Sequence, residues 1–547
     1  MTESLNPADA VRAALPSWLE LLGTDRVIDD RQSLDSHGRN AAGSANRAAA
    51  ILCPRDLGEV QQLMKIAARF RAPLYPISTG RNWGYGAASP GVAGAAVVDL
   101  SGLRRLRLID AELGIIAVEP GVTQQQLADF LVAQRLDLLV PVHGGGPDCS
   151  LLGNALERGY GLTPTTDHFA ALTSLTAVLP DGTVYRSPFE ALGAETIGAA
   201  HRWGIGPYLE GLFSQGNFGI VTEATLTLRR RPEHVEAFFV RVGDEPTLGA
   251  MADRLRDLLS SLGASIAGIN LMNDRRVLSM SRPYPVDQVP AGEVIPEPLC
   301  REMTSQAGIT SWTAAGVIHC PAALRRVIRR ELRRLLPPGC SRPIHMNRRR
   351  VGWARTLLRY LPAGKGSILQ QLDSIESLLD LADGIPRRIA LPLAYWLRGD
   401  LPHASAKLDP AQDGCGLIWY SPLVPMKSAT VIEYVRMVHR VCVAHGIEPL
   451  ITLTSLSERL FDSTVPLLYR PEESGAADRA RDCFQSLVSE GRRLGCLPYR
   501  LPVDQMQSFL SHEDGSHWGL VRTLKRAIDP HDVLAPGRYS FHSRQVR

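Results

Sequence analysis

The chain has 547 residues, of which 45% are apolar and 21% charged, and its formal net charge is +4. This length exceeds what a single hydrophobic core supports, so we expect roughly two to four domains. No apolar run reaches the about 20 residues that span a bilayer, and the N-terminus lacks a basic start followed by an apolar stretch. We therefore expect a cytoplasmic protein with no membrane partner.

The nine cysteines are scattered along the chain and never occur in CxxC spacing. This pattern argues against a disulfide framework and against a zinc site. We expect most of the thiols to be reduced and buried, and we expect no metal.

The first 235 residues predict one mixed α+β domain. A strand at 48–54 precedes a helix over Asp56–Phe70, which Asp56 is able to cap, and a second strand follows at 72–78. Short β-rich runs at 94–100, 105–110 and 114–121 lead to a helix at 122–135 and a strand at 136–142. Asp181-Gly182 then joins two β runs in a predicted hairpin, and a last strand lies near 217–233.

The character of the sequence changes between residues 236 and 499. Longer helical patterns occupy 248–262, 428–446 and 477–495, with β runs at 390–397 and 416–424. Two or three helices beside an antiparallel sheet would suit this pattern. The tail, 500–547, holds one further helix over 517–528.

Arginines are unusually dense between Leu324 and Tyr360. Their pairs recur every three to four residues around apolar positions, which indicates an amphipathic helix with a basic face. Three interpretations stay open: a solvated surface, a docking face for an acidic partner protein, and a nucleic-acid face. The last lacks an aromatic stacking platform, so we expect no nucleic-acid partner.

A glycine-dense loop, PISTGRNWGYGAASPG, follows the predicted strand at 72–78 and spans residues 76–91. It is not a GxxxxGK[ST] loop, and because no helix follows it, it is not the dinucleotide fingerprint either. Its backbone N–H groups are still able to form a nest for an anion.

The loop resembles the pyrophosphate-cradling loop of the vanillyl-alcohol oxidase / p-cresol methylhydroxylase family of FAD-dependent oxidoreductases. Further segments are similar to that family in the same order: SLLGNALERGYGLTPTTDHF, GIGPYLEGLFSQGNFGIVTEATLTL, LPYR and DPHDVLAPGRY. The resemblance implies a discontinuous FAD-binding domain, residues 1–235 with the return segment 500–547. Residues 236–499 would form an α+β substrate cap, and the enzyme would be a homodimer.

The resemblance also assigns residues to the cofactor. It implies that the backbone of Ser78, Thr79, Gly80, Arg81 and Asn82, completed by Gly84 and Tyr85, cradles the FAD pyrophosphate. Ser150, Gly153, Asn154, Arg158 and Gly159 would line the flavin. The adenine would lie beside Gly219, Ile220 and Val221, and the flavin ring would lie near Arg538.

By the same resemblance, Tyr85, Tyr499 and Arg500 would hold a phenolate oxygen. A free phenol has a pKa of about 10, so its ionisation near neutral pH needs a cation and strong donors. The ionised oxygen would drive hydride transfer from the para benzylic carbon to FAD, which leaves a quinone methide. Oxygen or an electron-acceptor protein would then reoxidise the flavin.

The sequence departs from the family at two places. Leu417 stands where many members have a histidine that bonds FAD covalently, and no tyrosine occurs near Asp409, so we expect non-covalent FAD. The alternatives are a bond to His403 or an ester through Asp409. Ser457, Arg459, Leu460 and Phe461 replace catalytic histidines, and Asp148 is a candidate for the catalytic aspartate. These changes keep a second hypothesis open, in which the substrate is a non-phenolic biosynthetic intermediate.

Overall fold

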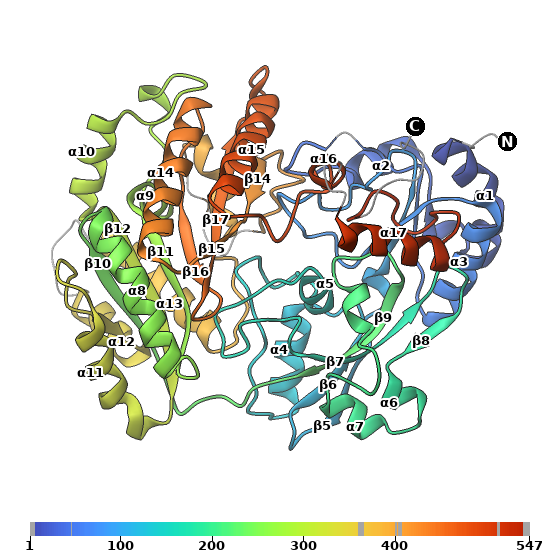
Figure 1. The fold of residues 1–547 in the computed structure, drawn as a ribbon, viewed down its shortest axis with the longest axis horizontal. Coiled ribbons are helices and arrows are strands. Elements are labelled where there is room, and N and C mark those ends of the chain that lie inside the picture. Colours follow the sequence, from blue (N-terminus) through green and yellow to red (C-terminus); the bar gives the residue numbers. More distant parts are fainter. Residues whose placement is uncertain are drawn as a thin grey trace.

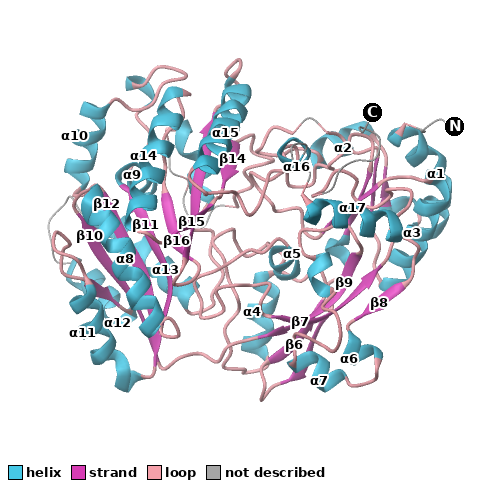
Figure 2. Cartoon of the chain, in the orientation of Figure 1, coloured by secondary structure: helices cyan, strands magenta, loops and turns pink. Residues whose placement is uncertain are grey.

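The computed structural model describes residues 6–44, 46–358, 366–399, 402, 407–510 and 515–539. Their helices and strands form three sheets in two halves that face each other (Figures 1 and 2). His403 lies outside the described residues.

Two sheets make up the first half of the chain. A four-stranded sheet has the order β1-β2-β4-β3, with β2, β3 and β4 parallel: β1 Val27–Ile28, β2 Ala50–Leu52, β3 Leu74–Ile77 and β4 Ala96–Asp99. An antiparallel sheet follows in the order β5-β6-β9-β7-β8: β5 Leu106–Asp110, β6 Ile115–Val118, β7 Leu172–Val178, β8 Val184–Arg186 and β9 Ile220–Thr227. The helices of this half are α1 Pro7–Leu22, α2 Arg31–His37, α3 Leu57–Phe70, α4 Gln124–Ala133, α5 Leu151–Leu156, α6 Pro188–Ala191 and α7 Glu195–Ala200.

Local signals explain the boundaries of these elements. The Asp56 side chain accepts the backbone N–H of Glu59 and so caps α3. The buried face of α3 packs on α1. Gly182, with a φ of +84°, makes the turn between β7 and β8.

The third sheet forms the core of the second half. Its order is β13-β10-β12-β11-β16-β17-β14, with β15 also paired to β17: β10 His234–Val242, β11 Ile266–Asn273, β12 Trp312–Cys320, β13 Ile344–Met346, β14 Gly416–Tyr420, β15 Leu423–Pro425, β16 Thr452–Ser455 and β17 Leu460–Tyr469. The helices of this half are α8 Glu245–Leu262, α9 Asp274–Ser281, α10 Glu297–Ala307, α11 Arg325–Leu335, α12 Arg348–Leu358, α13 Gly366–Ala382, α14 Ser428–Ala444 and α15 Ala476–Arg493.

Strand β10 shows why helices cover both faces of this sheet. Successive side chains of a strand point to opposite faces. Phe238 and Val240 join the large core with α8, α14 and α15, whereas Ala237 and Phe239 pack with α12 and α13. The expected antiparallel sheet with helices beside it is therefore confirmed, but the described residues of this half form eight helices, α8 to α15, where two or three were expected.

The chain returns to the first half after residue 499. Helices α16 Met506–Leu510 and α17 Ser516–Ile528 lead to a segment that hydrogen-bonds along β3, with Leu74 N–H donating to Val533 O at 2.8 Å. The Lys525 ammonium is buried and donates to Leu534 O and Asn217 O, both at 2.8 Å. In Figure 1 α17 accordingly lies beside the N-terminal elements. The boundaries at residues 235 and 499 stay a prediction.

Two predicted strands are wrong. The run at 390–397 forms a 3-10 helix, Leu391–Arg398, whose apolar side chains are buried. A short buried apolar run fits either structure, and Pro392 removes a ladder donor. The run at 136–142 makes only an isolated bridge between Leu138 and Arg230 and contains Pro141.

Candidate active site

A cavity of about 330 Å³ lies between the two halves, and its walls come from segments far apart in the sequence. The first half contributes the glycine loop, the start of α5 and residues 215–221, and the tail adds Arg538. Ala394, Leu417, Trp419 and Arg500 close the opposite side.

The glycines of the loop have different tasks. Gly80, Gly84 and Gly86 all have positive φ, between +65° and +122°. A Cβ on Gly84 would lie 2.5 Å from Trp419, and one on Gly86 would overlap Val503. Two of the three glycines therefore allow the loop to pack against other segments, while the space beside Gly80 is open to ordinary contact.

The facing wall begins at α5. Ser150 caps this helix, because its Oγ accepts the Gly153 N–H at 2.9 Å and donates to Pro120 O at 2.6 Å. A Cβ on Gly153 would overlap Ser78 Oγ, so only glycine lets the two walls approach this closely. This close-walled cradle, lined by backbone groups, fits an extended anionic dinucleotide such as FAD.

The predicted cofactor residues line this cavity, with three exceptions. Gly84 packs against Trp419, as described above. Arg158 donates from Nε to Ser214 Oγ at 2.9 Å, and a Cβ on Gly159 would overlap the Asn154 amide. These residues support the wall from behind, and Asn154 itself contacts His168 Nδ1 at 2.6 Å.

Two arginines share a carboxylate at one side of the cavity. Glu157 forms an ion pair with Arg538 and lies 3.4 Å from Arg500 Nε. Arg538 also donates to the Tyr75 hydroxyl at 3.0 Å, and Arg500 donates to Asn82 Oδ1 at 2.7 Å. The predicted Arg500 is therefore fixed to the glycine loop, and Glu157 was not predicted.

The predicted phenolate residues lie together. The Arg500 guanidinium carbon is 4.3 Å from the centre of the Tyr85 ring, and the Tyr85 hydroxyl is 2.7 Å from Ser421 Oγ. Burial raises the pKa of Tyr85 to about 12 and that of Tyr499 well above its ordinary value. Both hydroxyls therefore stay protonated near neutral pH and can donate hydrogen bonds. Tyr85 and Arg500 line the cavity, whereas Tyr499 lies behind its lining.

Asp462 is a buried acidic residue that was not predicted, and it interacts electrostatically with Tyr85, Tyr499 and Arg500. It lies on β17, is almost fully buried, and its Oδ1 has no hydrogen-bond partner in the described part of the chain. Burial raises its pKa to about 7, against the opposing effects of the Tyr160 hydroxyl and the Arg500 charge. The signal in the sequence was a single acidic residue inside a β run.

A histidine also lines the cavity, although none stands at 457–461. His143 accepts the Gly145 N–H through Nδ1 at 3.2 Å, so the neutral ring carries its proton on Nε2. Burial, and then the charge of Arg500, lower the pKa of His143 to about 4. The ring is therefore uncharged near neutral pH.

Asp148 lies apart from these groups. Its side chain is 56% exposed and forms an ion pair with Arg388 at 2.9 Å, and it is not among the residues that line the cavity. Its catalytic role stays a prediction. Asp462, whose pKa the charge of Arg500 lowers, is likewise absent from the cavity lining and lies behind it.

The chain is similar to known proteins in sequence and in fold. Residues 48–187 match the family described as "FAD binding domain". The chain is 35% identical over 534 residues to 1'-carboxy-chondrochloren decarboxylase of Chondromyces crocatus, covering 96% of this chain and 97% of that protein. It is 25% identical over 538 residues to the 4-cresol dehydrogenase flavoprotein subunit of Pseudomonas putida, covering 96% and 94%.

Two solved structures share the fold. p-Cresol methylhydroxylase with bound substrate superposes with a TM-score of 0.86 at 23% identity, covering 98% of both chains. 4-Ethylphenol oxidase from Gulosibacter chungangensis gives 0.85 at 22% identity, covering 100% and 99%.

The chain therefore belongs to the vanillyl-alcohol oxidase / p-cresol methylhydroxylase family. It is an FAD-dependent oxidoreductase with the two-domain fold of that family. The predicted family, fold class, enzyme class and cofactor are confirmed. None of the helices in the described ranges has the length and apolar character that a membrane crossing needs.

We expect FAD to be held without a covalent bond. Leu417 is buried in the cavity wall, and its aliphatic side chain has no nucleophile. The Asp409 carboxylate is held by Arg81 and accepts the Trp83 indole N–H at 3.2 Å, so it is not free to attack. Acid precipitation should leave a yellow supernatant; a yellow pellet with the mass of the chain plus one FAD would contradict this expectation.

Proposed function

We propose that this enzyme oxidises a para-substituted phenol by removing a hydride from the carbon attached para to the hydroxyl. The observation that carries the proposal is the position of Arg500. Its guanidinium lies against Tyr85 at the edge of the cavity lined by the predicted FAD residues. A cation with hydroxyl donors stabilises a phenolate, whose oxygen supplies the electrons for hydride loss.

FAD, held by the glycine loop, the start of α5 and Arg538, would supply the hydride acceptor. The protein's own task is to bind the phenol as its anion. Glu157 is balanced by Arg538, so the positive charge of Arg500 remains for Asp462 or for the phenolate. A phenolate and an ionised Asp462 beside the single charge of Arg500 would be unfavourable. The proton of the phenol would therefore pass to Asp462 when the phenolate forms its ion pair with Arg500.

A second candidate reaction adds loss of CO₂ to the same hydride step. It rests on the 35% identity to a protein named a decarboxylase, over almost the whole of both chains. Hydride loss from a benzylic carbon gives a quinone methide. If the next carbon carries a carboxylate, its C–C bond can break: CO₂ leaves, the bonding pair forms a new C=C bond, and the ring returns to a phenolate. The substrate would then be a carboxylated phenolic intermediate of biosynthesis.

Anaerobic mixing with matched compounds tests both candidates. We expect 4-ethylphenol and 3-(4-hydroxyphenyl)propionate to bleach the flavin, and their O-methyl ethers not to, because an ether cannot become a phenolate. One CO₂ per flavin reduced by the propionate, with a 4-hydroxystyrene product, would establish decarboxylation. Equal bleaching by phenol and ether would contradict the proposal and favour a non-phenolic substrate.

A further inference from the structure

One segment of the cap carries a concentrated positive charge that catalysis does not use. Residues 322–358 contain eleven arginines and one acidic residue, Glu331, whereas the whole chain has 60 basic and 56 acidic residues. The structure divides this segment into α11, β13 and α12, and Figure 1 shows α11 and α12 at the outer end of the cap. The predicted amphipathic basic helix is α11.

The orientation of α11 about its axis is fixed by its inner face. Ile328 and Leu332 are buried in the core beneath α8. Arg329 donates from Nε to Glu236 Oε1 at 2.8 Å, and Glu236 is fully buried and also contacts His345 Nδ1 at 2.8 Å. A buried carboxylate held in this way prevents the helix from rotating without leaving a charge unpaired.

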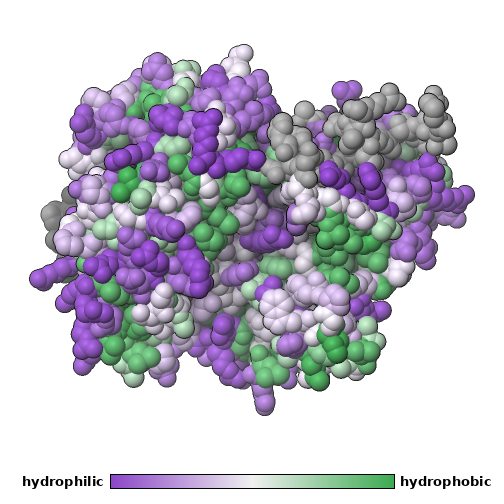
Figure 3. Space-filling view, viewed as in Figure 1, coloured by the Kyte–Doolittle hydropathy of each residue, from purple (hydrophilic) through white to green (hydrophobic). Residues whose placement is uncertain are grey.

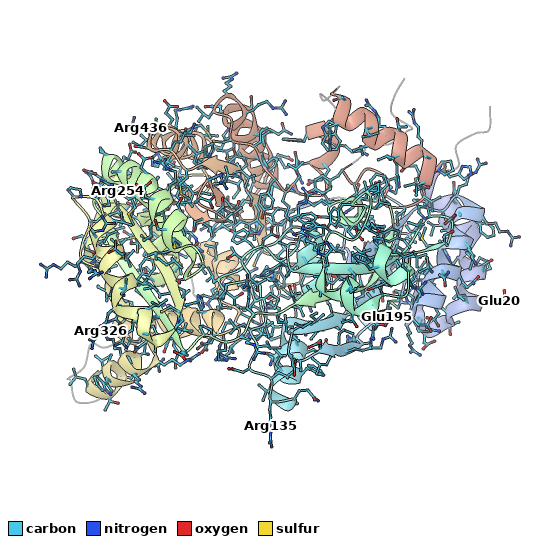
Figure 4. All side chains as sticks on the ribbon, turned by 60° about the horizontal axis from the view of Figure 1, so that its bottom comes forward. Glu20, Arg135, Glu195, Arg254, Arg326 and Arg436 are labelled. Atoms are coloured by element: carbon cyan, nitrogen blue, oxygen red, sulfur yellow. The ribbon has the colours of Figure 1, made fainter. Side chains whose placement is uncertain are left out.

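The opposite face of α11 is consequently basic. Arg326, Arg330, Arg333 and Arg334 are exposed on it, at the three- and four-residue spacing that places side chains on one side of a helix. Arg326 and Arg333 form no ion pair with any residue in the described ranges. Figure 4 places Arg326 at the outer edge of the cap, and Figure 3 shows hydrophilic residues over this region.

We propose that this face of α11, defined by Arg326, Arg330, Arg333 and Arg334, docks an acidic helix of a partner protein. The arginines repeat about every 5.4 Å along the axis, which is also the spacing of glutamates four residues apart on a facing helix. Trp353 of α12, 77% exposed at the same end of the cap, offers the kind of aromatic anchor that protein interfaces use. Among the large apolar residues of α11 only Val327 is exposed, with Leu324 exposed just before the helix, and these are too few for the apolar face that a lipid surface binds.

Binding of synthetic peptides to the purified holoenzyme tests this surface. One probe is a stapled helix with glutamates four residues apart; the other has the same composition but contains D-residues that prevent a helix. We expect the helical peptide to bind more tightly at low salt. The triple variant Arg326→Glu/Arg330→Glu/Arg333→Glu should lower its affinity about tenfold or more.

The matched control reverses three exposed arginines elsewhere: Arg135, Arg254 and Arg436, which Figure 4 labels on other parts of the surface. It changes the net charge equally and should alter affinity less than about twofold. Anaerobic flavin reduction should be unchanged in both variants. The control should melt slightly earlier, because Arg436 is ion-paired with Glu245 at 2.6 Å and Arg254 lies 3.9 Å from Asp257. The glutamine triple variant at 326, 330 and 333 should show a smaller loss of affinity.

Three results would overturn the proposal. Equal binding of the two peptides would mean attraction of any polyanion. An equal loss in the control variant would mean that net charge alone decides. Stronger binding to phosphatidylserine-containing vesicles than to the helical peptide, abolished by the α11 variant, would assign the face to a lipid surface.

Discussion

Replacing Arg500 with alanine is expected to leave FAD bound and to lower kcat/KM for phenolic substrates roughly a hundredfold or more. Arg500 is the cation that remains for the phenolate once Arg538 is paired with Glu157. Without it a phenolate would enter a largely buried site lined by the neutral Tyr85, with Asp462 and the neutral Tyr499 buried behind the lining. FAD should stay because Arg538 and the backbone of the glycine loop are unaltered.

Stopped-flow reduction without oxygen measures this effect, and the flavin spectrum reports retention of the cofactor. Arg388→Ala is the matched control, because Arg388 is also an arginine ion-paired to a carboxylate but does not line the cavity. That variant also removes the partner of Asp148. Near-normal rates in Arg500→Ala would remove the phenolate site from the proposed mechanism. An equal loss in Arg388→Ala, which frees Asp148, would instead assign the effect to Asp148.

The residues that could be predicted from the sequence share one property: their signal is local. The glycine loop, the cap of α3 and the hairpin at Asp181-Gly182 are each encoded within a few neighbouring residues. The same is true of the Tyr499-Arg500 pair, which a family resemblance identified. Its location beside Tyr85 then followed from the fold.

The missed residues owe their character to contacts between distant segments. Glu157 looks like a surface charge until Arg500 and Arg538 flank it, and Asp462 becomes a group with a pKa near 7 only because β17 is buried. Gly84 is the opposite case, a predicted cofactor residue whose role comes from a distant contact. It was assigned to the cofactor, but the structure shows that it packs against Trp419 of the cap, which lies 335 residues later in the chain.

Replacing Asp462 with asparagine is expected to abolish an ionisation near pH 7 in the pH profile of kcat/KM. In the native enzyme the Asp462 carboxyl must be deprotonated to accept the phenol's proton. Activity should therefore rise with pH and level off above its pKa of about 7. Because asparagine cannot accept the proton, the variant must bind the phenolate that is already present in solution. With a phenol pKa of about 10 that fraction is roughly a thousandth at pH 7, and we expect a loss of roughly a hundredfold or more.

The sign of the effect on stability gives a second measurement that does not depend on turnover. The pKa of Asp462 is about 7 in the folded protein and has an ordinary value of 3.8. Between these values the folded state holds a proton that the unfolded state has released, so the free energy of unfolding falls as the pH rises from about 4 to 7. Asp462→Asn should lack this contribution, so its free energy of unfolding should depend less steeply on pH than that of the native enzyme. Because Asp462→Glu keeps a carboxyl, it should retain part of both pH dependences. Tyr160→Phe removes a hydroxyl that lowers the pKa of Asp462, so it should shift both pH dependences to higher pH. A native pH profile of kcat/KM in Asp462→Asn, or a native enzyme without the ionisation near pH 7, would contradict the role of Asp462. The phenol would then lose its proton directly to solvent or to another group in the cavity.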